Sequence, residues 1–161
     1  MAIKVGDRVP AATFTVMTGE GPKPKTSDEI FKGRKVVLFA VPGAFTPTCH
    51  KNHMPGFVKN AGAIKAKGVD TIAVTGVNDV FVMEAWKKST GADGKIEFLA
   101  DGNAEFAKAI DMAFDASGPG LGTRSKRYSM LVEDGVVKQF NVEDAPGKCD
   151  ISGGQALLAK L

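Results

Sequence analysis

The chain of 161 residues is 43% hydrophobic and 24% charged, with a formal net charge of +3. This length is typical of one domain with a substantial core, and we expect residues 1–161 to form a single domain. Interspersed lysines and acids argue against a nucleic-acid partner. No long apolar run and no secretory or transit pattern is present, which argues against a membrane partner and favours a cytoplasmic location.

The first third of the chain alternates between extended and turn patterns. Residues 12–16 alternate apolar and polar side chains, which predicts a short edge strand. Residues 19–25 are rich in glycine and proline and predict a turn that forms an exposed, hairpin-like connection. Residues 26–29 form a capping box that opens a short helix. The apolar run of residues 36–41 then predicts a strand buried on both faces.

The rest of the chain predicts alternating helices and strands. A helix from residue 47 onward is expected to kink at Pro55. Asn78 is expected to cap a later helix whose core face includes Phe81 and Trp86. Further predictions are strands at 70–77, 96–100, 128–133 and 136–142, a helix after 103, a surface loop at 115–126 and a capping box at 152–155. This order predicts an α/β fold with a mixed central sheet flanked by helices.

Cys49 stands where a strand turns into a helix. Pro42-Gly43 ends the strand, and the glycine is expected to adopt the positive φ of a sharp turn. Thr46 is a candidate N-cap and Pro47 suits the first helical position, which puts Cys49 in the first turn. The free N–H groups and the positive dipole end there favour a thiolate, the reactive form. We interpret Cys49 as a reactive cysteine, the alternative being an inert buried thiol.

Two histidines follow Cys49 closely. Cys49, His50 and His53 could offer three ligands to a metal ion, but the chain has no CxxC and no second ligand cluster. We therefore expect no bound metal. His53 is expected to be structural or near a dimer contact, and the sequence suggests no role for His50.

Several short motifs are shared with one known family. They are PGAFTPTC at residues 42–49, HMPG at 53–56, KVGD at 4–7, VND at 77–79 and RYSM at 127–130. In combination they resemble peroxiredoxins of the Prx5-like, or type II, subfamily, and the resemblance covers essentially the whole chain. It implies a thioredoxin-like fold and a thiol-dependent peroxidase that reduces hydrogen peroxide and small organic hydroperoxides.

The resemblance also implies roles for four residues. Cys49 would attack the peroxide, Pro42 would shield the site from water, and Thr46 would hydrogen-bond the peroxide. Arg127, from the RYSM motif, would steady the thiolate and the departing oxygen. Thr46 could instead serve only as an N-cap. Arg127 could be a solvated strand end, and from charge alone Arg124 or Lys126 could take its place.

The oxidised Cys49 would be a sulfenic acid, which a second thiol must reduce. Cys149 is the only other cysteine, and animal-type members of the family have a resolving cysteine in a comparable late position. In many bacterial and plant members this position is not cysteine, and glutathione, glutaredoxin or thioredoxin attacks directly. The sequence leaves both routes open. The resemblance further implies a homodimer made through faces near the active site, and no metal, haem or flavin.

Two other classes of function make different predictions. A thioredoxin-fold binding module with Cys49 as a redox sensor would be oxidised by peroxide but would show little turnover. A metal-binding protein using Cys49, His50 and His53 would carry zinc after purification. The helix-terminal thiol within a matching set of motifs favours the peroxidase.

Overall fold

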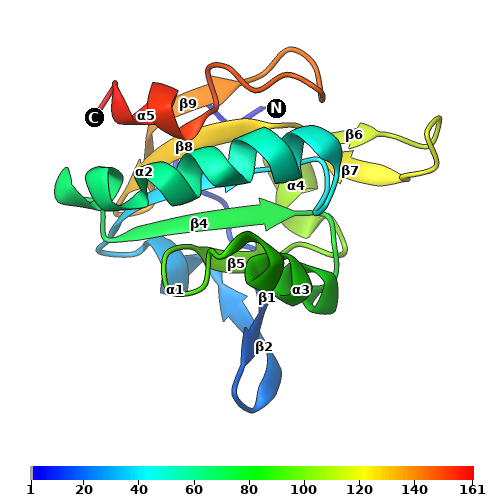
Figure 1. The fold of residues 1–161 in the computed structure, drawn as a ribbon. Coiled ribbons are helices and arrows are strands. Elements are labelled where there is room, and N and C mark those ends of the chain that lie inside the picture. Colours follow the sequence, from blue (N-terminus) through cyan, green and yellow to red (C-terminus); the bar gives the residue numbers. More distant parts are fainter. Residues whose placement is uncertain (1) are drawn as a thin grey trace.

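The computed structural model describes residues 2–161 and is built from β-strands joined by short helices (Figure 1). The strands are β1 (Thr13–Thr18), β2 (Gly21–Thr26), β3 (Lys35–Ala40), β4 (Thr71–Gly76), β5 (Glu97–Ala100), β6 (Ala113–Asp115), β7 (Thr123–Ser125), β8 (Tyr128–Glu133) and β9 (Val136–Val142). The helices are α1 (Ser27–Phe31), the π-helical turn η1 (Cys49–His53), α2 (Met54–Ala66), α3 (Val80–Thr90), α4 (Glu105–Ala109) and α5 (Gly154–Leu158). Within the described residues, no helix has the length and apolar character needed to cross a bilayer.

Seven strands form one sheet in the order β2-β1-β5-β4-β3-β8-β9, while β6 and β7 form a separate pair. At the centre, β3 pairs in parallel with β4 and antiparallel with β8. Residues 36–40 are all buried, as expected of a strand covered on both faces. The predicted mixed sheet flanked by helices is confirmed.

Alternate residues of β3 face opposite layers of the fold. Val37 and Phe39 belong to the core beneath α2, α3 and α5, and Cys49 belongs to the same core. Val36 and Leu38 belong to the core on the other face, beneath α1 and α4. Fully burying one such side chain contributes roughly 1.5–3 kcal/mol, so both cores hold the central strand firmly. In Figure 1, α2 runs along the sheet and begins near the carboxyl end of β4.

The first hairpin differs from its prediction. β1 is not an edge strand, because it pairs with β2 along its length and with β5 on its other side. The proline-rich stretch expected to be a turn forms β2, which is the edge. Pro22 and Pro24 can lie there because an edge strand leaves one side of its backbone unpaired. In Figure 1 the β1–β2 hairpin projects from the body of the fold.

The segment expected to be a surface loop at residues 115–126 also differs. Three residues of β6 pair with three residues of β7 in antiparallel register, and Phe114 lies opposite Arg124. Strands of three residues are too short to show an alternation of apolar and polar side chains. The glycines and proline between them therefore led to the prediction of a loop. The hairpin places Arg124 beside the loop that precedes Cys49.

The start of α3 is capped by Asp79 and not, as predicted, by Asn78. The Asp79 carboxylate accepts a hydrogen bond from the backbone N–H of Val82 at 2.9 Å. The Asn78 side-chain oxygen accepts instead from the backbone N–H of Ala44 at 2.9 Å, which ties α3 to the loop before Cys49. Phe81, predicted to face the core, is 65% exposed.

Candidate active site

Cys49 lies at the start of the helix that follows β3, as predicted. Helical backbone begins at Pro47, and the N–H of His50 donates to the carbonyl of Thr46 at 2.8 Å. From Cys49 the helix widens into the π-helical turn η1, in which the N–H of Met54 donates to the Cys49 carbonyl. The sequence suggested a kink at Pro55 but not this turn. Cys49 itself is fully buried.

A buried arginine faces the Cys49 sulfur. Nη2 of Arg127 lies 3.0 Å from Sγ of Cys49 and also donates to the carbonyl of Pro146 at 3.0 Å. Nη1 of Arg127 lies 2.9 Å from Nδ1 of His53. The Arg127 side chain is 2% exposed, so its charge acts on the sulfur with little screening by water. A permanent cation in this position offsets negative charge that develops next to the sulfur.

His53 is a neutral partner of Arg127. Burial, and then the charge of Arg127, lower the pKa of His53 to about 3. The neutral ring must accept at Nδ1, because arginine can only donate. Nε2 therefore carries the hydrogen and donates to the carbonyl of Ser152 at 2.9 Å. With both nitrogens used, His53 fixes the plane of the guanidinium, a role that its sequence position did not reveal.

Thr46 occupies the N-cap position, but its hydroxyl does not cap the helix. Oγ1 of Thr46 donates to the carbonyl of Gly43 at 2.7 Å. Because the hydroxyl hydrogen is used there, the lone pairs of Oγ1 remain available to accept a hydrogen bond. Pro42 is buried, and its carbonyl accepts from Nη1 of Arg124 at 3.2 Å.

We call residues 143–152 the covering segment, because they lie against Arg127 and the first turn of the helix. Oγ1 of Thr48 donates to the carbonyl of Gly147 at 3.0 Å. Oε2 of Glu143 accepts from the backbone N–H of Asp150 at 2.7 Å and from the N–H and hydroxyl of Ser152 at 2.8 and 2.6 Å. The Ser152 hydroxyl is thereby used on Glu143, so the predicted capping box is wrong, and Gly153 is the N-cap of α5.

Cys149, on the covering segment, is half-buried and reduced. Burial raises the pKa of Cys149, the charges of Glu143 and Cys49 raise it further, and the charge of Arg127 lowers it. In this arrangement Cys149 is a thiol at neutral pH.

The family model described as Redoxin matches residues 4–158. The chain belongs to the redoxin family. It is 49% identical over 165 residues to the chloroplastic peroxiredoxin-2E-2 of Oryza sativa subsp. japonica, an alignment covering 99% of this chain and 72% of that protein.

Solved structures place the chain more narrowly within the family. The crystal structure of reduced Prx3 in complex with hydrogen peroxide, from Vibrio vulnificus, matches with a TM-score of 0.94 at 47% identity over 98% of both chains. Peroxiredoxin 5 from Alvinella pompejana matches with a TM-score of 0.84 at 35% identity, covering 98% of this chain and 96% of that one. This protein is a Prx5-like peroxiredoxin, a thiol peroxidase with a thioredoxin-like fold.

His50, for which the sequence suggested no role, is bonded to the only tryptophan of this peroxiredoxin. Nε1 of the fully buried Trp86 donates to Nδ1 of His50 at 3.0 Å. The imidazole ring also stacks on Phe45, with ring centroids 5.6 Å apart. Phe45 is 48% exposed and has a φ of 64°, in the left-handed region. His50 thus links the α3 core to an exposed aromatic ring beside Thr46.

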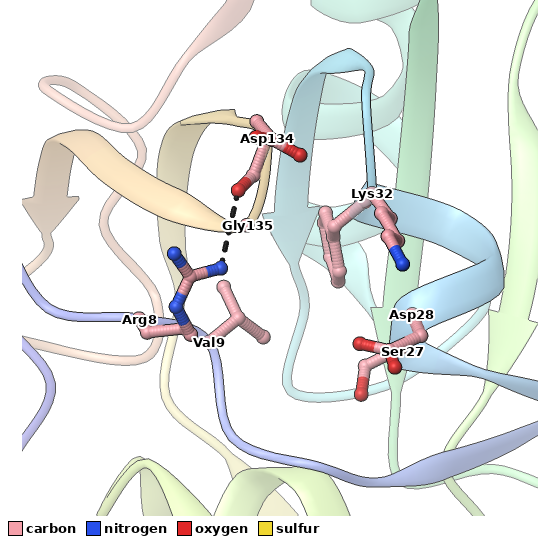
Figure 2. A pocket seen from close by; sticks show the side chains of 8 residues that line it. Arg8, Val9, Ser27, Asp28, Lys32, Asp134 and Gly135 are labelled. Atoms are coloured by element: carbon pink, nitrogen blue, oxygen red, sulfur yellow. Dashed lines mark hydrogen bonds between the residues drawn. The ribbon is translucent and has the colours of Figure 1, made fainter.

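One hollow of this peroxiredoxin is lined by residues outside the Cys49 site, and another borders Arg127. Figure 2 shows one of about 290 Å³, in which Arg8 and Lys32 lie on opposite sides and Nη1 of Arg8 donates to the carbonyl of Asp134 at 3.3 Å. A hollow of about 260 Å³ is lined by Arg127 together with Lys126 and the first residues of the covering segment. Within residues 2–161, no three His, Cys, Asp or Glu side chains are grouped to hold a metal ion.

Proposed function

We propose that Cys49 is the nucleophile of this thiol peroxidase and that Arg127 is its electrostatic partner. The observation that carries the proposal is the 3.0 Å contact between Nη2 of Arg127 and Sγ of Cys49, made by a buried guanidinium. The guanidinium thus contacts the atom that attacks the peroxide and offsets negative charge on it.

In the proposed step, the Cys49 thiolate attacks one oxygen of the peroxide. A sulfur–oxygen bond forms and the oxygen–oxygen bond breaks, with its electron pair moving to the departing oxygen. That oxygen takes a proton and leaves as water or an alcohol, while Cys49 becomes a sulfenic acid. The donors of Arg127 stabilise the negative charge that develops on the departing oxygen.

Thr46 and Pro42 complete the proposed site. The lone pairs of Thr46 Oγ1, left free by its bond to Gly43, accept the O–H of the peroxide and direct it toward the sulfur. The buried ring of Pro42 keeps water from the thiolate and so strengthens the electrostatic contacts inside.

We propose hydrogen peroxide and small organic hydroperoxides as the substrates. Support comes from the burial of Cys49, which is 0% exposed and so favours small molecules over bulky ones. The similar Vibrio vulnificus protein was crystallised with hydrogen peroxide. The chemistry needs no resident metal, haem or flavin, because the thiolate itself supplies the two electrons.

The reductant that returns Cys49 to the thiol is proposed to be glutathione with glutaredoxin, or thioredoxin. A thiol attacks the sulfenic sulfur, a disulfide forms and water leaves. Cys149 would supply this thiol in a two-cysteine cycle. Its place on the covering segment, which contacts Arg127 and Thr48, supports that role. The raised pKa of Cys149, due first to burial, opposes the role of attacking thiol unless the covering segment moves.

We also propose a cytoplasmic homodimer. Phe45, Phe81 and Leu121 are 48%, 65% and 38% exposed. Phe45 lies in the loop before Cys49, the Asn78 side chain at the start of α3 accepts from that loop, and Arg124 joins the carbonyl of Leu121 to that of Pro42. Exposed apolar side chains gathered around one loop are typical of a surface that a second protein covers. Sedimentation of the purified protein tests the dimer.

The deciding experiment is intact mass under non-reducing conditions after one equivalent of hydrogen peroxide, with a sulfenic-acid trap present. Trapped sulfenic acid on Cys49 with Cys149 free supports the proposal and a one-cysteine cycle. Loss of two hydrogens supports it with Cys149 as the resolving thiol. An unchanged mass, or consumption of peroxide by a Cys49→Ser variant at the wild-type rate, contradicts the proposed role of Cys49.

A further inference from the structure

We propose that Arg124 is a positioning residue for the peroxidase reaction, holding the loop of residues 42–46 so that the Thr46 hydroxyl faces the peroxide. The inference rests on the roles proposed above for Cys49 and Thr46. Arg124 lies on β7, outside the strand–helix unit that carries Cys49, and sequence reasoning considered it only as a substitute for Arg127.

The Arg124 guanidinium is held between two backbone carbonyls. Nε donates to the carbonyl of Leu121 at 2.9 Å, within the same hairpin, and Nη1 donates to the carbonyl of Pro42 at 3.2 Å. A guanidinium is planar and donates in fixed directions. The two bonds therefore set the distance between the β6–β7 hairpin and the loop before Cys49.

The absence of a side chain at Gly43 is required by this contact. A Cβ at that position would lie 2.6 Å from Nη1 of Arg124 and 3.0 Å from Cγ2 of Thr46. Gly43 is not among the residues with a positive φ, so the sequence-based expectation of a left-handed turn glycine is wrong here. The glycine is needed for space, because Arg124 and Thr46 pack against the same point.

The effect of Arg124 reaches the reacting atoms through Gly43. The carbonyl of Gly43 accepts from the hydroxyl of Thr46 at 2.7 Å and from its backbone N–H at 3.3 Å. The peptide that Arg124 holds at Pro42 is thus joined directly to the group that orients Thr46. Displacing a catalytic group by about 1 Å can slow a reaction on the order of 100-fold. Arg127, in contrast, contacts the sulfur itself.

The test is a double-mutant cycle on the rate at which hydrogen peroxide oxidises reduced Cys49, measured by rapid quench and mass. Arg124→Ala is expected to slow oxidation about 10- to 100-fold in the wild-type background. In a Thr46→Val background the same change should slow it less than about twofold, because Arg124 acts through the missing hydroxyl. Arg124→Lys, which can still donate to the Pro42 carbonyl, should recover part of the rate. Lys95→Ala, which removes an exposed cation from another part of the chain, should match the wild type.

An equal loss from Arg124→Ala in both backgrounds would overturn the inference, because a general structural effect is additive. A wild-type rate in Arg124→Ala would overturn it as well. Should Arg124→Ala fail to fold, Arg124→Gln is measured in the same two backgrounds with the same expectations. Failure of the proposed function is a separate result, since in that case wild-type Cys49 is not oxidised at all.

Discussion

The indole N–H of the buried Trp86 donates to Nδ1 of His50, the residue that directly follows Cys49. The single tryptophan of the chain is therefore joined by one hydrogen bond to the turn that carries the nucleophile. Trp86 lies at core spacing, so the sequence suggested no functional role for it. Its indole N–H nevertheless contacts the residue next to Cys49.

His50→Leu should leave the Trp86 N–H buried without an acceptor. We expect the free energy of unfolding to fall by about 1–3 kcal/mol, as for other buried donors that lose a partner. His50→Asn can keep an acceptor near the place of Nδ1 and should cost less. Urea unfolding followed by tryptophan fluorescence measures both, and equal stability of the two variants would contradict the assigned bond.

Arg127→Ala should slow the oxidation of Cys49 by hydrogen peroxide about 100- to 1000-fold, the effect typical of losing one donor to a developing negative charge. The matched control is Arg8→Ala, which removes an arginine that is bonded to a backbone carbonyl in the hollow of Figure 2. Rapid-quench rates should separate the two variants. Similar rates in both would show that the contact of Arg127 with Cys49 is not used.

The buried neutral His53 predicts loss of stability in acid. Its pKa falls from 6.5 in the unfolded chain to about 3 in the folded one. Between these values the unfolded chain binds more protons, so the free energy of unfolding falls as the pH falls from about 6.5 to 3. The slope is at most about 1.4 kcal/mol per pH unit.

Urea unfolding at pH 7, 6 and 5 measures this slope, with His53→Asn as the comparison because asparagine does not titrate. Burial raises the pKa of Asp101, so this carboxyl changes the free energy of unfolding with pH in the opposite direction. Because Asp101 is present in both proteins, its contribution cancels when their pH profiles are subtracted. Parallel pH profiles for wild type and His53→Asn would rule out His53 as the cause.

Gly154→Ala should loosen α5 from α2. A Cβ at Gly154 would lie 2.7 Å from the carbonyl oxygen of Gly56 and 3.0 Å from the backbone N of Phe57. Backbone atoms cannot rotate away, and overpacking of this kind costs about 1–3 kcal/mol. Gly62→Ala on the same α2 helix meets nothing within 4 Å and is the control. Thermal unfolding of the two variants should differ by several degrees.

The sequence predicted the central strand and the place of Cys49 because their signals are local. A short apolar run, a proline at the first helical position and the cysteine two residues later all lie within one stretch of chain. The contact between Arg127 and Cys49 spans 78 positions, and only the resemblance of motifs pointed to it. The carbonyl of Pro146, which accepts from the same arginine, has no side-chain signature at all. Packing of distant segments decided these contacts, and Arg124 and His53 were underestimated for the same reason.

The prolines of β2 also bear on how copies of this protein can meet at high concentration. Pro22 and Pro24 lie opposite Met17 and Thr15 of β1, so their ring nitrogens lie on the same side of the strand, away from the partner. Another chain that approached this edge to extend the sheet would find no N–H donor at either position. Fibril growth by strand addition is therefore hindered at the β1–β2 hairpin, which projects from the body of the molecule.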